Sequence, residues 1–348
     1  MLHSATSTVA AEACKAPISV GEAWAGAAVA AVVVVAGAGV AEGNRMNPTR
    51  TRLLLRTALQ AAALVSALAL ATASALAASS RHAFDTPEAA MAAFGEAVAI
   101  NDEAALKVML GADYHEFIPP VGADIRYTFL ELWAQARAIQ LVNDKRALVS
   151  VGKEGWTLPI PIVKSDAGWR FDTMAGAEEM RTRRIGRNEL AAMQTLLAIR
   201  DAELEYVASD HDGDGVLQYA SKLSSSPGKR DGLHWPSRAD EPQSPIGPAL
   251  ASAGLGSSAG YHGYRYKLLT EQGPHAPGGA LSYIAKGRLF GGFAVIAWPV
   301  TYLDSGVKTF MVTHDAQIYE RDLGADTAAR AAGIKAFDPG PGWSKASP

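Results

Sequence analysis

Cysteine is nearly absent from the sequence: Cys14 is the only one in 348 residues. Because it lies close to the N-terminus, a chain that loses a leader segment has none. Disulfides, zinc-thiolate sites and cysteine nucleophiles are then excluded. A basic tail is also missing, and the formal net charge is −3. A general role in nucleic-acid binding therefore has no electrostatic support.

Some sequence signatures of particular reactions are missing too. There is no His-Glu-x-x-His zinc motif, and no glycine-rich phosphate loop that continues into Lys and then Ser or Thr. We therefore assign no catalytic residue and no organic cofactor from the sequence.

A cleavable leader is expected over residues 46–77. A basic stretch from Met46 to Arg56 precedes a nearly uncharged run rich in Ala and Leu, which is the plan of a signal peptide. Small residues at the end of the run predict cleavage near Ala77. The product would be periplasmic or secreted, without a membrane segment. The alternative is a retained anchor, because the run is about long enough to cross a bilayer.

Residues 1–45 fit this plan poorly. They contain a second apolar stretch, Ala23 to Ala41, and a signal peptide seldom begins at position 46. We interpret Met46 as the true start and residues 1–45 as a mis-called start. The alternative is an additional N-terminal membrane helix.

Residues 82–175 predict an α+β domain. Capping and apolar spacing indicate helices from Asp85 onward, at 102–110 and at 129–137. Strands follow at 146–151, 157–163 and 168–172. This order resembles the nuclear-transport-factor-2-like (NTF2-like) fold, a cone of helices and a curved sheet. The resemblance implies a small-ligand pocket, for which the sequence offers Phe94, Phe117, Phe129, Trp133 and Trp156. The alternative is that such aromatic residues fill a core.

The second half predicts a long helix followed by an antiparallel sheet. The helix runs from Met180 to Ser209 within an element of helix and Asp-rich loop at 178–222. Its apolar stripe is predicted to contain Leu190, Met193, Leu197, Leu204 and Val207. A Pro- and Gly-rich loop and strands at 263–269, 292–298, 308–313 and 318–321 make up residues 223–340. This half resembles the globular domain of pilins. The predicted fold class is α+β with two subdomains.

The sharpest local motif is an Asp-rich loop. Asp210, Asp212 and Asp214 alternate and Gly215 follows, as in the first half of a calcium loop of the EF-hand type. The carbonyl of Val216 and the side chain of Gln218 would supply further oxygens. Ser221 stands where a bidentate Glu is expected, so we predict weak calcium binding. The alternative is a helix-capping turn without an ion.

Several stretches of the chain form a recognisable set: Gly168-Trp-Arg-Phe-Asp172, Arg183-Arg-Ile-Gly-Arg-Asn-Glu-Leu190, Asp210 to Tyr219, Ser226-Pro-Gly-Lys229, Asp231-Gly-Leu-His-Trp-Pro236, Tyr261-His-Gly-Tyr264 and Ile296-Ala-Trp-Pro299. With these stretches the chain resembles one bacterial family, the domain-of-unknown-function family 2950 (DUF2950), over about Phe84 to Pro339. The resemblance implies export and a shared architecture, and it names no catalytic residue.

Three functions are compatible with these patterns. The first is a non-enzymatic envelope protein that binds a protein or glycan partner, or scaffolds an assembly, with calcium stabilising its second domain. The second is a hydrolase of wall or polysaccharide, with a site between the subdomains formed by His234, His262 and carboxylates. The third is small-ligand binding in the N-terminal cone. The arginines from Arg181 to Arg187 are interpreted as either a binding cluster or a salt-bridged face.

Overall fold

The computed structural model describes residues 82–117, 122–237, 240–252 and 260–348. The predicted signal peptide, the apolar stretch from Ala23 to Ala41 and Cys14 lie outside the described residues. Within the described residues, no helix is long and apolar enough to cross a membrane. The buried side chains form two clusters, one between residues 90 and 171 and the other between residues 192 and 337.

The helices of the first half begin at side-chain caps. In α3 (Pro87–Ile100), Thr86 Oγ1 accepts the N–H of Ala89 at 3.1 Å, and proline occupies the first turn. Asp102 caps α4 (Glu103–Leu110) in the same way. Two further helices follow, α5 (Tyr114–Phe117) and α6 (Ala123–Gln135). The predicted third helix therefore exists, but it begins and ends earlier than residues 129–137.

An antiparallel sheet completes the first half. Its strands, in spatial order, are β1 (Arg137–Asn143), β2 (Arg146–Val151), β4 (Ile162–Ser165) and β5 (Gly168–Phe171), and β3 (Trp156–Thr157) also pairs with β2. The single strand predicted over 157–163 is divided in two, because Pro159 and Pro161 have no N–H to donate to a ladder. Helix α3 contacts β1 and β5, and the Phe94 ring lies 5.4 Å from that of Phe171.

The long helix α7 (Thr173–Tyr206) begins where Asp172 accepts the N–H of Ala175 at 3.1 Å. Its buried stripe is offset from the predicted one, since Leu190 is 42% exposed and Met193 is only partly buried. The buried positions instead include Ala192, Leu196, Ile199, Glu203 and Tyr206.

The second half contains a five-stranded antiparallel sheet with spatial order β15-β13-β12-β11-β6. The strands are β6 (Tyr264–Leu269), β11 (Ala294–Pro299), β12 (Lys308–Thr313), β13 (Ile318–Asp322) and β15 (Ser344–Ala346). The four strands predicted here are confirmed to within a few residues. Every residue of β11 is buried, so both faces of the sheet are covered at this strand.

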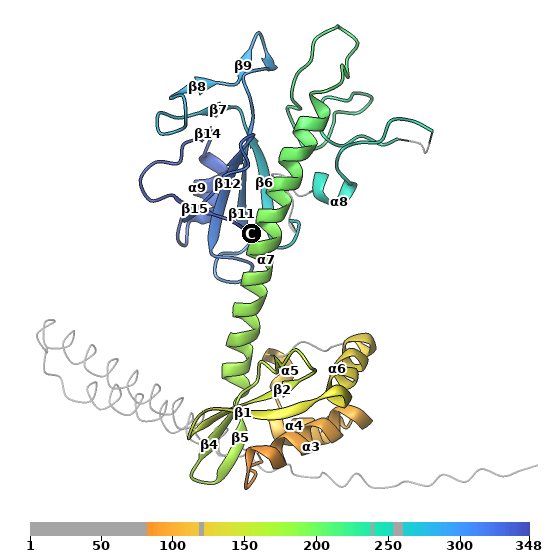
Figure 1. Cartoon of the computed structure of the whole chain (residues 1–348), viewed down its shortest axis with the longest axis vertical. Helices are drawn as coiled ribbons and strands as arrows, with labels where there is room; N and C mark the ends of the chain where they lie inside the picture. Colours follow the sequence, from red (N-terminus) through yellow and green to blue (C-terminus); the bar gives the residue numbers. More distant parts are fainter. Residues whose placement is uncertain (1–81, 118–121, 238–239, 253–259) are drawn as a thin grey trace, which may run out of the picture. The chain divides into compact units, whose positions relative to one another are not determined.

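Helix α7 lies along this sheet and contacts β11 and β12 (Figure 1). Polar side chains of α7 also bond to the loops that end the strands. Glu189 Oε1 accepts the N–H groups of Val307 at 2.9 Å and Lys308 at 3.0 Å. Asn188 donates to the carbonyl of Ser305 at 2.9 Å, and Arg200 donates to the carbonyl of His314 at 3.0 Å. These bonds set the position of the helix along the strands.

Smaller elements surround this sheet. A three-stranded sheet contains β7 (Glu271–Gln272), β8 (Leu281–Ser282) and β14 (Ala336–Phe337), and a hairpin joins β9 (Ile284–Ala285) to β10 (Arg288–Leu289). Two short helices are α8 (Pro248–Ala251) and α9 (Thr327–Gly333), of which α9 contacts β11. The predicted α+β class, with a helix followed by an antiparallel sheet in the second half, is confirmed.

Substitution by alanine should have opposite effects on stability at two helical glycines, Gly95 and Gly186. A Cβ at Gly95 in α3 would overlap the Trp133 ring, whereas a Cβ at Gly186 in α7 would meet nothing within 4 Å. We expect Gly95→Ala to destabilise the protein by about 1 to 3 kcal/mol. Gly186→Ala should stabilise it by about 0.5 to 1 kcal/mol, because alanine loses less backbone entropy in a helix. Urea unfolding of both variants measures the two effects, and equal shifts would contradict this account of Gly95.

Candidate metal centre

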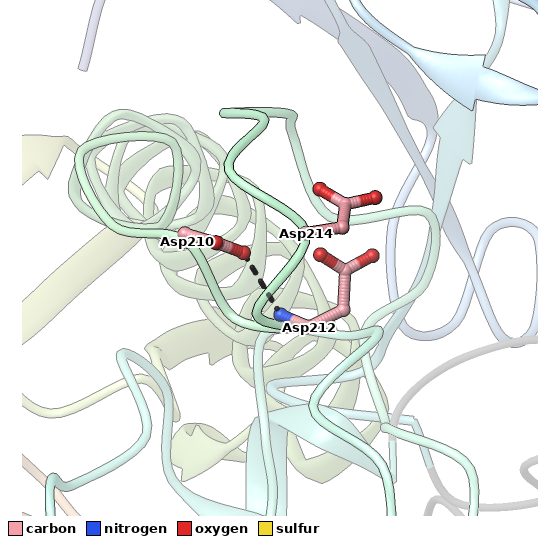
Figure 2. Close-up of side chains that lie close together, drawn as sticks. All are labelled: Asp210, Asp212 and Asp214. Carbon is pink, nitrogen blue, oxygen red and sulfur yellow. Dashed lines mark hydrogen bonds between the residues drawn. The ribbon is translucent and has the colours of Figure 1, made fainter.

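Three carboxylates gather in the loop that follows α7. Asp210, Asp212 and Asp214 each offer one oxygen, and these oxygens lie within 4.8 Å of one another. Figure 2 shows the carboxylates of Asp212 and Asp214 side by side, with that of Asp210 directed toward the backbone of Asp212. In the part of the chain that the structure describes, this is the one group of three or more His, Cys, Asp or Glu residues that could hold a metal ion.

The backbone of the loop orients the Asp210 side chain. Asp210 Oδ1 accepts the N–H groups of Asp212 at 3.2 Å and Gly213 at 2.8 Å, and Oδ2 accepts that of Gly215 at 2.7 Å. Gly215 has a φ of 82°, which residues with a Cβ rarely adopt. This glycine therefore lets the chain turn back so that its N–H reaches Asp210.

Hydrogen bonds keep two of these carboxylates ionised. The N–H of Gly215 is the main cause of the lowered pKa of Asp210. A hydrogen bond from Arg288 is the main cause of the lowered pKa of Asp214. Both groups are therefore anionic at neutral pH, as ligands of a hard cation must be.

Arg288 is a member of this cluster that the sequence did not indicate. Its Nη2 donates to Asp214 Oδ2 and lies 4.0 Å from Asp212 Oδ2. Arg288 lies in β10, 74 positions after Asp214, so no local spacing connects the two residues. The guanidinium brings a positive charge to the carboxylates, where a metal ion would also bring one.

The other predicted ligands occupy different places. Gln218 reaches the cluster, since its Nε2 donates to Asp212 Oδ2 at 3.1 Å. For Val216, the N–H donates to Asp214 Oδ1 at 3.0 Å. Ser221 donates from Oγ to the carbonyl of Asp231 at 3.1 Å and so points to another part of the chain. The structure thus brings together the three aspartates and Gln218, and the complete ligand set stays a prediction.

A family model described as a protein of unknown function, DUF2950, matches residues 81–346. The chain belongs to this family. The family resemblance inferred from the sequence is thereby confirmed. No curated protein and no solved structure matches the chain. The NTF2-like and pilin-like resemblances of this DUF2950 protein therefore stay predictions.

The histidines considered for a hydrolase site are engaged in separate local contacts. His234 Nδ1 lies 3.0 Å from Ser244 Oγ and 3.0 Å from the carbonyl of Ile246. A cavity of about 370 Å³ beside His234 has no carboxylate among its described lining residues. His262 has a φ of 50°, and its ring lies 4.2 Å from that of Tyr261. In this DUF2950 protein, these contacts therefore bring neither His234 nor His262 to a carboxylate.

Ser226, Lys222 and Asp231 form a polar group that resembles a nucleophile with its base. Lys222 Nζ lies 2.6 Å from Ser226 Oγ and 2.9 Å from Asp231 Oδ2, and Ser226 Oγ donates to Asp231 Oδ2 at 3.0 Å. Burial raises the pKa of Asp231, but the bonds from Ser226 and Lys222 outweigh it and hold that pKa at about 2. These contacts join Lys222 and Ser226 to Asp231 and so connect two parts of the loop.

The predicted arginine cluster of this DUF2950 protein is engaged in ion pairs. Within the arginine cluster, ion pairs join Arg181 to Glu178, Arg183 to Glu179 and Arg184 to Asp304. These pairs favour the salt-bridged interpretation over the binding one.

The aromatic residues proposed to line an N-terminal pocket do not all face inward. Phe94 is 7% exposed, and its ring lies 6.1 Å from that of Phe129. The rings of Phe129 and Trp133 are 5.6 Å apart. Trp156, by contrast, is 44% exposed, and the guanidinium of Arg183 lies 5.7 Å from its ring centroid. Trp156 therefore belongs to the surface around α7.

Glu203 is a buried carboxyl group that the sequence analysis missed. Its Oε2 accepts the N–H of Ala220 at 2.9 Å, while Oε1 has no partner among the described residues. Burial raises the pKa of Glu203 to about 8. A signal did exist, because Glu203 continues the helical spacing of Leu196 and Ile199, and a charged residue on an apolar stripe is unusual.

The pKa of Glu203 predicts a specific dependence of stability on pH. An unfolded glutamate titrates near 4.5 and the folded one near 8, so between these pH values only the folded state holds the proton. The free energy of unfolding should therefore fall as the pH rises from about 5 to 8. Glu203→Gln should make this decline shallower, and the exposed neighbour variant Glu205→Gln should not. Urea unfolding at three pH values tests this, and identical slopes for wild type and Glu203→Gln would refute it.

Proposed function

We propose that this chain is an exported, non-enzymatic binding or scaffolding module whose second half is stabilised by calcium at Asp210, Asp212 and Asp214. The observation that carries the proposal is the convergence of these three carboxylates, one of them oriented by three backbone N–H groups. Neighbouring carboxylates repel one another, and the single guanidinium of Arg288 offsets only part of their charge, so a cation is favoured among them.

The donor atoms favour calcium over other common metals. The cluster offers only oxygen ligands, which suit hard cations, and it contains neither the imidazole nor the thiolate that zinc prefers. Calcium accepts irregular coordination, whereas magnesium requires a nearly ideal octahedron. Because Ser221 supplies no bidentate carboxylate, we expect a dissociation constant on the order of 10⁻⁴ to 10⁻³ M, as in extracellular modules.

The proposed role of the ion is structural. It would join the end of α7 to the segment that continues toward Ala220. The proposed partner is an envelope protein or a glycan in the periplasm or outside the cell, in keeping with the signal-peptide plan of residues 46–77. The hydrolase alternative has less support, because among the described residues neither His234 nor His262 forms a hydrogen bond or ion pair with a carboxylate.

Calcium should bind to the metal-stripped protein and stabilise it. At a concentration ten times the dissociation constant, we expect about 1.4 kcal/mol of stabilisation. Asp210→Asn should abolish the calorimetric heat and the rise in melting temperature, while Asp166→Asn, which changes an exposed aspartate in a distant turn, should not. Magnesium serves as the ion control. Absence of both heat and thermal shift in the wild type would refute the proposal.

Arg288 should compete with calcium for Asp214. Removing the guanidinium in Arg288→Ala frees the carboxylate, so calcium should bind several-fold more tightly, while the metal-free protein becomes less stable through loss of the ion pair. Lys286→Ala, which changes a nearby exposed cation of the same hairpin, is the matched control. Weaker calcium binding in Arg288→Ala would show that Arg288 supports the site.

A further inference from the structure

A polar cavity of about 580 Å³ lies beside the Asp-rich loop. One part of its wall comes from the end of α7 and from Asp212 and Gln218. Another part comes from the segment that carries Lys229, Arg230 and Asp231. This volume falls in the usual range for small-molecule sites. The lining residues are mainly charged or amide-bearing, so a polar ligand fits the cavity better than an apolar one.

The segment with the two cations is held in place by its own hydrogen bonds. Pro227 and Gly228 form a turn closed by the N–H of Lys229 on the carbonyl of Ser226 at 3.0 Å, and Gly228 has the required positive φ of 73°. The N–H of Ser226 donates to Asp231 Oδ1 at 2.7 Å. The Tyr206 hydroxyl donates to the carbonyl of Arg230, which ties the segment to α7. Lys229 and Arg230 therefore stand on a backbone with a defined shape.

The acidic residues around the cavity have polar or charged partners, whereas its two basic residues have no ion pair within the described residues. Asp231 is paired with Lys222 at 2.9 Å, and Asp212 accepts a hydrogen bond from Gln218 and lies 4.0 Å from Arg288. By contrast, no carboxylate in the described parts of the chain forms an ion pair with Lys229 or Arg230. Lys229 and Arg230 thus bring two adjacent positive charges to the cavity wall, and neither charge is paired with a carboxylate of the described residues.

Arg230 is also oriented for recognition. Its guanidinium lies 5.4 Å from the ring centroid of the buried Trp235, and this stacking limits the rotation of the planar group. A guanidinium held in this way can donate two parallel N–H groups to a carboxylate or phosphate, and Lys229 adds a second positive charge next to it. The oxygens of Asp212, Gln218 and Asp231 can accept hydrogen bonds from hydroxyl groups.

We propose that this cavity binds a small acidic sugar, with its carboxylate or phosphate on Lys229 and Arg230 and its hydroxyl groups on Asp212, Gln218 and Asp231. The proposal rests on the binding role proposed above and names its ligand class, but it does not require calcium. Both anionic groups share the chemistry that the two cations recognise, and the choice of sugar in the experiment separates them.

The test is calorimetric titration of the full mature chain in low salt with EDTA present. Glucuronate supplies the carboxylate, glucose 6-phosphate the phosphate, and glucose is the neutral control. We expect at least one acidic sugar to bind and glucose not to bind. Lys229→Ala and Arg230→Ala should each weaken binding about tenfold or more. Lys153→Ala, which changes an exposed lysine in the first half, should leave it unchanged.

Outcomes of this test separate the two proposals. Failure of both acidic sugars to bind, equal binding of glucose, or unchanged affinity in Lys229→Ala would overturn the cavity proposal. Lys229 is exposed, so its truncation should leave the melting temperature unchanged, and the variant stays informative if Arg230→Ala unfolds. Asp210→Asn should keep sugar binding in EDTA. A wild-type protein that binds an acidic sugar but no calcium contradicts the metal proposal alone, and one that binds calcium but neither acidic sugar contradicts this proposal alone.

Discussion

The packing of α7 against β11 and β12 is the contact on which the second half of the protein depends. The apolar stripe of the helix supplies the free energy of burial, but an apolar stripe alone permits sliding along a sheet. Glu189, Asn188 and Arg200 prevent this, because each bonds to a main-chain group at the end of a strand. The helix is thereby held in one register. The position of its last turn then determines where the Asp-rich loop begins.

Both candidate sites are consequences of this register. The last turns of α7 carry Glu203 and Tyr206, and the Asp-rich loop begins shortly after them. Glu203 accepts the N–H of Ala220 and so closes the far end of the loop, while Tyr206 reaches the carbonyl of Arg230. One helix end thus positions the aspartates on one side and the cationic segment on the other. The cavity is what remains between them.

Structural features that depend on neighbouring residues could be predicted from local patterns. The Thr86 and Asp102 caps, the strands of the second sheet and the alternation of the three aspartates could all be predicted, because spacing of a few residues determines them. Contacts over long sequence distance could not. Nothing near Asp214 indicates Arg288. The stripe of α7 was misplaced because Leu190 is exposed, whereas Glu203, a charged residue, is buried on the same face as Leu196 and Ile199. The cavity is likewise invisible in the sequence, since it joins segments separated along the chain.

The ion pair between Arg288 and Asp214 changes what metal binding would mean for this chain. The Asp-rich loop is already paired with a cation of the protein, the guanidinium of Arg288 in β10. The loop can therefore fold before it meets a metal ion, so folding and ion binding need not happen in the same place or at the same time. Calcium would then exchange with a guanidinium instead of ordering a disordered segment. The observed heat would include the release and rehydration of that guanidinium, and little backbone entropy would be lost.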